Sequence, residues 1–197
     1  NQPTRDNYLN SLSASGPNDV WAVGHYATDG RTDQRTLTMH WDGSSWSIVP
    51  SPNVGSNRNY LNGAASSGPN SAWAVGFYWN ASNVQRTLTM RWNGKSWNVV
   101  PSPDASAHEN YLNGVVAGGR EVWAVGLYSP DMVRYRSLMM RWNGSSWRIV
   151  PSPNAGAQDN YLLGVALAGR RDVWAVGYSS DAGANVRTMT MRRGCRR

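Results

Sequence analysis

The chain has 197 residues, of which 40% are apolar and 16% charged, a balance that excludes a disordered chain. Eleven Trp and nine Tyr accompany a single Phe, and rings with one polar edge suit half-buried strands. The net charge of +7 does not indicate a nucleic-acid partner, because four Arg crowd the last six residues and the remaining Arg form no basic stripe.

One repeat of about fifty residues occurs four times, and a repeat of this period is typical of propellers and solenoids. Asn-Tyr-Leu begins the copies at Asn7, Asn59, Asn110 and Asn160. Trp-Ala-Val-Gly follows at Trp21, Trp73, Trp123 and Trp174. An Arg opens a third segment at Arg35, Arg86, Arg136 and Arg187. Three copies then carry a pair of Trp residues and end in Val-Pro-Ser-Pro.

The first copy shows the elements expected of each copy, in chain order. Strands are predicted over residues 8–15, 20–26, 36–41 and 46–49. The second of these is almost wholly apolar, as expected for a strand covered on both faces, and the third alternates between apolar and polar side chains. Asp42-Gly43 indicates a tight hairpin turn, and Pro50 ends the fourth strand. Four antiparallel strands repeated radially form propeller blades.

The repeats resemble kelch or galactose-oxidase-type blades, because Val-Trp-Ala-Val-Gly stands where kelch repeats carry an apolar-Tyr-apolar-Gly-Gly strand. They are also similar to the Trp-rich repeat arrays of exported bacterial proteins. The resemblance covers nearly the whole chain and implies an all-β propeller, but it departs from kelch in having one Gly instead of two. It does not imply the copper chemistry of galactose oxidase, because the sole cysteine, Cys195, lies in the basic tail. Fold alone says little about function.

We therefore predict one β-propeller domain over residues 1–197, with four-stranded antiparallel blades. The predicted blades cover residues 7–52, 59–103, 110–153 and 160–191, followed by a basic tail over residues 192–197. The fourth copy has no second Trp and no Val-Pro-Ser-Pro, so its outer strand is missing. A closed four-bladed ring, half of an eight-bladed homodimer and a fragment of a longer array all fit this pattern. An uncovered third strand is an adhesive edge, through which two copies could pair.

The repeated Asn and Arg residues are candidate ligand-binding groups. Asn7, Asn59, Asn110 and Asn160 open the innermost strands, so their amides could form a polar ring that binds sugar or peptide at a mouth of the channel. Strand-end hydrogen bonding is the alternative. The Arg side chains at 35, 86, 136 and 187 could bind ligand or clamp the neighbouring blade.

The loops after the second strands differ between copies, and loops on a rigid scaffold often carry binding sites. Trp79 and Tyr135 are the aromatic candidates there, whereas the ten Trp residues in repeated positions are assigned to the core. Asp6, Glu109 and Asp159 stand next to repeated Asn residues, and as a group they could bind a cation, act as acid and base or remain solvated.

We predict no metal or other cofactor, because the three His share no ligand spacing and there is no Cys pair. No apolar run approaches the roughly 18 residues of a membrane span. The pattern favours a non-catalytic, secreted or cell-surface binding module, lectin-like, for carbohydrate. The alternatives are a protein-interaction scaffold within a larger exported protein and a propeller-type hydrolase or lyase.

Overall fold

The computed structural model describes residues 6–28, 33–55, 57–119, 121–169 and 172–194. These residues form fifteen strands in four antiparallel sheets. Three sheets have four strands and the last has three, each in simple chain order. No helix in the described ranges is long and apolar enough to cross a membrane.

Each sheet is one blade of the propeller. Blade 1 contains β1 (Asn7–Gly16), β2 (Asp19–Ala27), β3 (Gln34–Trp41) and β4 (Trp46–Ile48). Blade 2 contains β5 (Asn57–Gly68), β6 (Ser71–Trp79), β7 (Gln85–Trp92) and β8 (Trp97–Val99). Blade 3 contains β9 (Asn110–Gly118), β10 (Glu121–Tyr128), β11 (Arg136–Trp142) and β12 (Trp147–Ile149). Blade 4 contains β13 (Asn160–Leu167), β14 (Asp172–Ser180) and β15 (Val186–Gly194).

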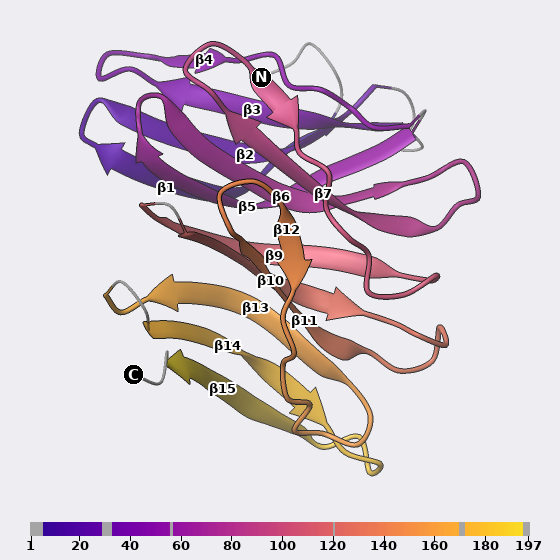
Figure 1. The fold of residues 1–197 in the computed structure, drawn as a ribbon. Coiled ribbons are helices and arrows are strands. Elements are labelled where there is room, and N and C mark those ends of the chain that lie inside the picture. Colours follow the sequence, from indigo (N-terminus) through magenta and orange to yellow (C-terminus); the bar gives the residue numbers. More distant parts are fainter. Residues whose placement is uncertain (1–5, 29–32, 56, 120, 170–171, 195–197) are drawn as a thin grey trace.

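The blades pack face to face in chain order, and the innermost strands β1, β5, β9 and β13 contact one another in succession. Blade 1 and blade 4 lie at opposite ends of the stack (Figure 1). The predicted all-β propeller of four repeated blades, the last without its outer strand, is therefore confirmed. β15 runs to Gly194, so the strand includes residues 192–194 of the predicted basic tail.

The blades have two different edges. One edge, which we call the loop edge, carries the loops between the second and third strands and the linkers between blades. The opposite edge, the turn edge, carries the short turns after the first and third strands. In Figure 1 the loop edge lies to the right and the turn edge to the left. The predicted tight turn at Asp42-Gly43 is present there, and its glycine and the equivalent ones have φ near +100°, at Gly43 (99°), Gly94 (92°) and Gly144 (104°).

The glycine of each Trp-Ala-Val-Gly segment has a packing cause. The first strand shifts register opposite this position, as between Leu9 and Ser11 in blade 1. A Cβ on Gly24 would overlap the carbonyl oxygen of Tyr8, and a Cβ on Gly76 would overlap that of Tyr60. Only a residue without a side chain lets the two strands approach so closely.

The core lies between blades, because each blade buries one face against the next. At the first junction Trp21 and Val23 of blade 1 pack against Leu61, Met90 and Trp97 of blade 2. The same positions meet at the second junction. At the third junction Trp123 and Val125 pack against Leu162 and Met189, without a counterpart of Trp97 because blade 4 has no outer strand. The first Trp of the repeat is at most 4% exposed in blades 1, 2 and 3, at Trp21, Trp73 and Trp123. These indoles pack the blades together, as repeated residues in a repeat protein generally do.

Candidate functional site

The repeated Asn side chains lie at the loop edge, but inside the protein. Asn59, Asn110 and Asn160 are fully buried. The side-chain oxygen of Asn110 accepts a hydrogen bond of 2.8 Å from the backbone N–H of Ala105 in the preceding linker. Asn59 and Asn160 accept equivalent bonds of 2.8 Å, and Asn7 is half-buried. The buried amides close the linkers between blades and leave no surface for a ligand.

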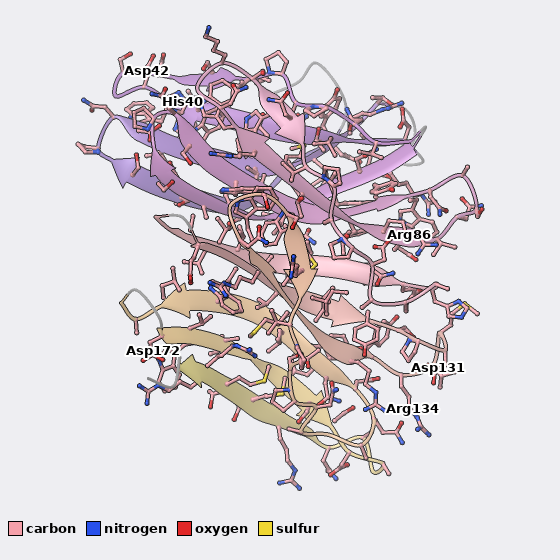
Figure 2. All side chains as sticks on the ribbon, viewed as in Figure 1. His40, Asp42, Arg86, Asp131, Arg134 and Asp172 are labelled. Carbon is pink, nitrogen blue, oxygen red and sulfur yellow. The ribbon has the colours of Figure 1, made fainter. Side chains whose placement is uncertain are left out.

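The repeated Arg side chains lie at the loop edge, where they contact groups of the linkers and loops. Arg86 donates to the carbonyl oxygens of Ser106 (3.1 Å) and Ala107 (3.2 Å) in the linker to blade 3, and Figure 2 shows it at that edge. Arg35 pairs with Asp33 at 2.9 Å. The other two are Arg136, half-buried at the start of β11, and Arg187, which lies 3.7 Å from Asp181. Arg86 thus acts as a clamp on the neighbouring linker.

Trp79 and Tyr135 are both half-buried. The Arg58 guanidinium lies 4.8 Å from the centre of the Trp79 ring, a cation–π contact. The Tyr135 hydroxyl donates a 2.6 Å hydrogen bond to Glu109. This bond and partial burial raise the pKa of Tyr135 well above its usual value.

The three candidate carboxylates do not converge as a group of three. Glu109 accepts from the Tyr135 hydroxyl, and Asp159 accepts from the Tyr135 backbone N–H at 2.9 Å. Asp6 belongs to the first blade, where its carbonyl oxygen accepts from Ala27. In the described part of the chain, no cluster of three or more His, Cys, Asp or Glu could hold a metal ion. The arrangement offers two carboxylates that hold Tyr135 in place.

An aromatic row crosses the inner strands near the loop edge, and sequence analysis did not identify it. Ring centres are 4.6–4.8 Å apart along Tyr8, His25, Tyr60, Phe77 and Tyr111. Burial raises the pKa of Tyr111 to about 12, so its phenol stays protonated at neutral pH. The row joins neighbouring blades by ring contacts, which are worth about 1 kcal/mol each beyond burial.

Another set of repeated side chains lies at the turn edge, beside the first Trp of each repeat. The residue paired with this Trp on the third strand is cationic or His, namely His40, Arg91, Arg141 and Arg192. The residue two positions before the Trp is Asp19, Ser71, Glu121 and Asp172. Strand residues two apart share a face, so both groups stand beside the indole.

In three blades the two groups bind each other. His40 Nε2 lies 2.7 Å from Asp19, Arg141 pairs with Glu121, and Arg192 lies 2.9 Å from Asp172. Figure 2 shows His40 and Asp172 at the turn edge. Burial alone would raise the pKa of Asp19, but hydrogen bonds from Ser15 and His40 hold it below its usual value. The carboxylates in blades 3 and 4 therefore neutralise an Arg, and the carboxylate in blade 1 binds the His40 ring.

Blade 2 breaks this pattern because Ser71 replaces the carboxylate. Arg91 is exposed, and its guanidinium carbon lies 5.6 Å from the centre of the Trp73 ring. Among the residues that the structure describes, no carboxylate pairs with Arg91. The positive charge is left available to solvent or to a ligand.

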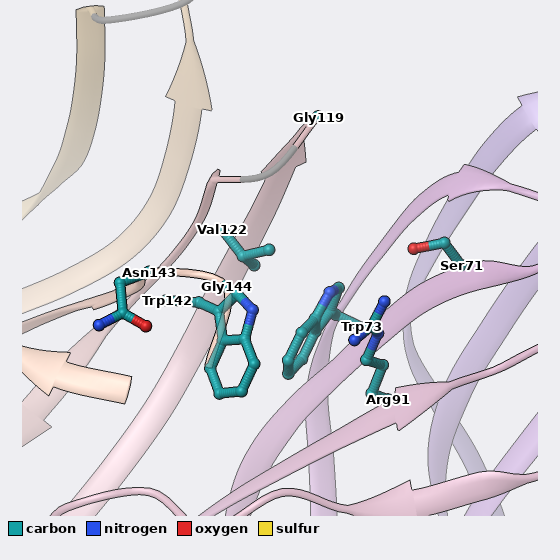
Figure 3. A pocket seen from close by; sticks show the side chains of 8 residues that line it. All are labelled: Ser71, Trp73, Arg91, Gly119, Val122, Trp142, Asn143 and Gly144. Carbon is teal, nitrogen blue, oxygen red and sulfur yellow. The ribbon is translucent and has the colours of Figure 1, made fainter. Parts of the chain in front are cut away.

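Arg91 lines a cleft of about 340 Å³ between blades 2 and 3. Ser71, Trp73 and Arg91 come from blade 2, and Trp142 and Asn143 come from blade 3 (Figure 3). The two indoles form the floor, with ring centres 5.1 Å apart. The Asn143 side-chain oxygen is used by its own turn, whereas its nitrogen makes only a 3.4 Å contact with Ser146. The Asn143 amide points away from the two indoles (Figure 3), so Arg91 and Ser71 are the hydrogen-bond donors beside them.

These features define a β-propeller repeat protein with a cleft between two blades. No family model matches the chain, and no curated protein matches it. Among solved structures it is similar to a fucose lectin from Kordia zhangzhouensis in complex with methyl-fucoside, at 14% identity and a TM-score of 0.47, covering 73% of this chain and 99% of the lectin. It is also similar to YCF48 bound to D1 peptide, at 12% identity and a TM-score of 0.41, covering 93% of this chain and 66% of that chain. The fold class rests on the strand topology described above.

Proposed function

We propose that the protein is a non-catalytic carbohydrate-binding module that takes its ligand in the turn-edge cleft between blades 2 and 3. One observation carries the proposal: the cleft combines two indoles with hydrogen-bond donors from Arg91 and Ser71. Pockets that fix small ligands use a few placed polar groups beside apolar side chains, and here the polar groups of Arg91 and Ser71 adjoin the indoles of Trp73 and Trp142. Sugars present many hydroxyl oxygens, which such donors can bind.

The cleft is a better candidate than the loop edge. There Asn59, Asn110 and Asn160 are buried, while Arg86 and Tyr135 are engaged by backbone and carboxylate groups. A ligand at the loop edge would have to displace these contacts, at a cost of about 1 kcal/mol for each neutral hydrogen bond. In the cleft the Arg91 guanidinium has no carboxylate partner among the described residues for a ligand to displace. We further propose a secreted or cell-surface location, which fractionation of the source cells would test.

Glycan-array screening of the intact protein, followed by titration calorimetry, tests this proposal. We expect binding to at least one glycan, and we expect Arg91→Met to weaken it about ten-fold or more, because a hydrogen bond to a charged group is worth about 1.5–3 kcal/mol. Arg141→Met is the matched control, since Arg141 is already paired with Glu121. The proposal is wrong if no glycan binds, or if Trp79→Ala weakens binding and Arg91→Met does not.

A further inference from the structure

We infer that the cleft between blades 2 and 3 selects sugars that carry a carboxylate, such as hexuronates. This inference rests on the proposed function and names its ligand class. Three of the four blades supply a carboxylate from the protein itself, at Asp19, Glu121 and Asp172. In blade 2 the protein supplies Ser71 instead, and the ligand supplies the missing negative charge.

The geometry fits such a ligand. In the paired blades the carboxylate and the cation both stand over the first Trp, with guanidinium-to-ring distances of 5.7 Å in blade 3 and 5.4 Å in blade 4. Arg91 holds the same position at 5.6 Å, so its guanidinium is already placed to receive a carboxylate. A planar guanidinium binds a carboxylate through two parallel hydrogen bonds. The Ser71 hydroxyl adds a donor where a protein carboxylate would have repelled the ligand.

Among the residues opposite the repeat Trp in the described part of the chain, only Arg91 lacks a carboxylate partner from its own blade. Arg193 lies 6.0 Å from the centre of the Trp123 ring, but it contacts the Pro151 carbonyl, and Glu121 stands there in place of Ser71. Arg141 and Arg192 remain neutralised by their own blades, at the third junction and on the open face of blade 4. We expect one acidic ligand per chain, although the repeat occurs four times.

Calorimetry with methyl glucuronide and methyl glucoside, at low and high salt, tests the inference. We expect the uronide to bind about ten-fold more tightly at low salt, with one site per chain and a difference that shrinks as salt screens the charge. Ser71→Asp should abolish the preference by restoring the blade-internal pair, without removing any side chain from the fold. Glu121→Ser is the matched control: it frees Arg141, but blade 4 has Arg193 at the position of Trp142, so we expect no second site.

The outcomes separate the two proposals. Equal affinity for the two glycosides would overturn the acidic-ligand inference and leave the carbohydrate proposal intact. Binding of sodium acetate as tight as that of the uronide would also overturn it, because recognition would then need no sugar. Failure of every saccharide to bind would refute the proposed function itself.

A different observation carries a second proposal: the two end faces of the stack are the two halves of a blade junction. On blade 1, Leu9 is 54% exposed and Trp46 is 45% exposed. Their counterparts in blade 2, Leu61 and Trp97, are buried against the preceding blade. We call this surface, with Leu12, the leading face.

Blade 4 exposes the complementary surface. Trp174 is 40% exposed and Val176 is 49% exposed, whereas the same repeat positions in blade 1, Trp21 and Val23, are buried against Leu61 and Trp97 of blade 2. We call Trp174, Val176 and Leu163 the trailing face. Exposed apolar patches of this kind mark interaction sites.

We propose that the trailing face of one chain binds the leading face of a second copy, closing an eight-bladed ring of two chains. The contact would resemble the first internal junction, with Trp174 and Val176 in place of Trp21 and Val23, and Leu9 and Trp46 in place of Leu61 and Trp97. At internal junctions an Asn amide also donates across, as Asn62 does to the Leu112 carbonyl at 2.9 Å. Leu163 replaces this amide on the trailing face, so the fourth junction is purely apolar at this point. Head-to-tail contacts form a ring when the rotation closes.

Light scattering over a range of concentrations tests the ring. We expect twice the mass of the 21.7 kDa chain, and a mass of one chain for Leu9→Asp and for Val176→Asp. Both substitutions lie on exposed positions, so circular dichroism should show an unchanged fold. A mixture of the two variants retains one intact junction and should form a weak heterodimer. A mass of one chain for the unaltered protein at every concentration, or a mass that grows without limit, would overturn the proposal.

Discussion

Replacement of the same repeat Trp by Ala in two blades should have different costs, although the local sequences are nearly identical. Trp73 is 2% exposed and packs against Trp142 and Trp147, with ring centres 5.1 Å and 5.3 Å away. Trp174 occupies the same repeat position on the open face of blade 4 and is 40% exposed. The pair separates the effect of burial from the effect of the residue type.

The magnitude follows from the area withdrawn from water. A Trp side chain buries up to about 250 Å², and burial contributes about 25 cal/mol per Å². The product of about 6 kcal/mol is an upper bound, because Ala keeps part of the buried area. Large aromatic truncations cost about 3–5 kcal/mol, so loss of the Trp73 side chain from a closed junction should cost about 4 kcal/mol. Trp174 already leaves about 100 Å² in water, so Trp174→Ala should cost about 2.5 kcal/mol less.

Urea unfolding, followed by Trp fluorescence and circular dichroism at low protein concentration, measures both losses. Low concentration matters because self-association would bury Trp174. Equal losses of unfolding free energy for the two variants in dilute solution would show that burial at the blade junctions does not stabilise the fold. The reasoning from burial would then be refuted.

Three further substitutions test other contacts. Asn62→Ala should lower the free energy of unfolding in urea by about 1 kcal/mol, because the carbonyl of Leu112 loses its donor. Asn98→Ala, on the surface, is the control and should lower it less. Equal losses would exclude a role of Asn62 in the junction. Gly76→Ala should lower the free energy of unfolding by about 3 kcal/mol, because its Cβ would overlap the Tyr60 carbonyl oxygen. Gly16→Ala is the control, because there is open space around Gly16. Similar melting temperatures for the two variants would contradict the close approach of β5 and β6. Burial lowers the pKa of His25, so folding favours the neutral ring, and its stabilisation is present above the unfolded pKa near 6.5 and is lost as pH falls below it. His25→Phe, which copies Phe77, should flatten this slope of unfolding free energy against pH; an unchanged slope would assign it to other groups.

The blades were predictable because their signals are local. Trp-Ala-Val-Gly, the Asn-Gly or Asp-Gly turns and Val-Pro-Ser-Pro fix strand, turn and strand end within a few residues. The assignment of repeated Trp to the core was confirmed for the buried Trp21, Trp73 and Trp123. Trp46 and Trp174 depart from it only because no blade covers them in this chain, and their own sequence could not reveal that.

The site was less predictable because it depends on contacts between copies. The repeated Asn residues were predicted to form a polar ring, because the strand order places them at the channel mouth. Only the structure shows that the linker between blades folds over Asn110. The acidic residues at the turn edge can be found in the sequence, because they stand two positions before the first Trp of the repeat. Their meaning required the register that sets Trp73 opposite Arg91.

Departures from a repeat are informative when the other copies reveal what the position does. Asp19, Glu121 and Asp172 each bind the His or Arg opposite the repeat Trp, so Ser71 is a loss of a known partner and not a neutral variation. Leu163 likewise replaces an amide that crosses the junction in the first three blades, on the face that no blade covers. Natural proteins tend to break their own local rules at functional surfaces. The two departures lie on different blades and different faces, so a ligand at Arg91 and a second chain at Trp174 can be gained or lost independently.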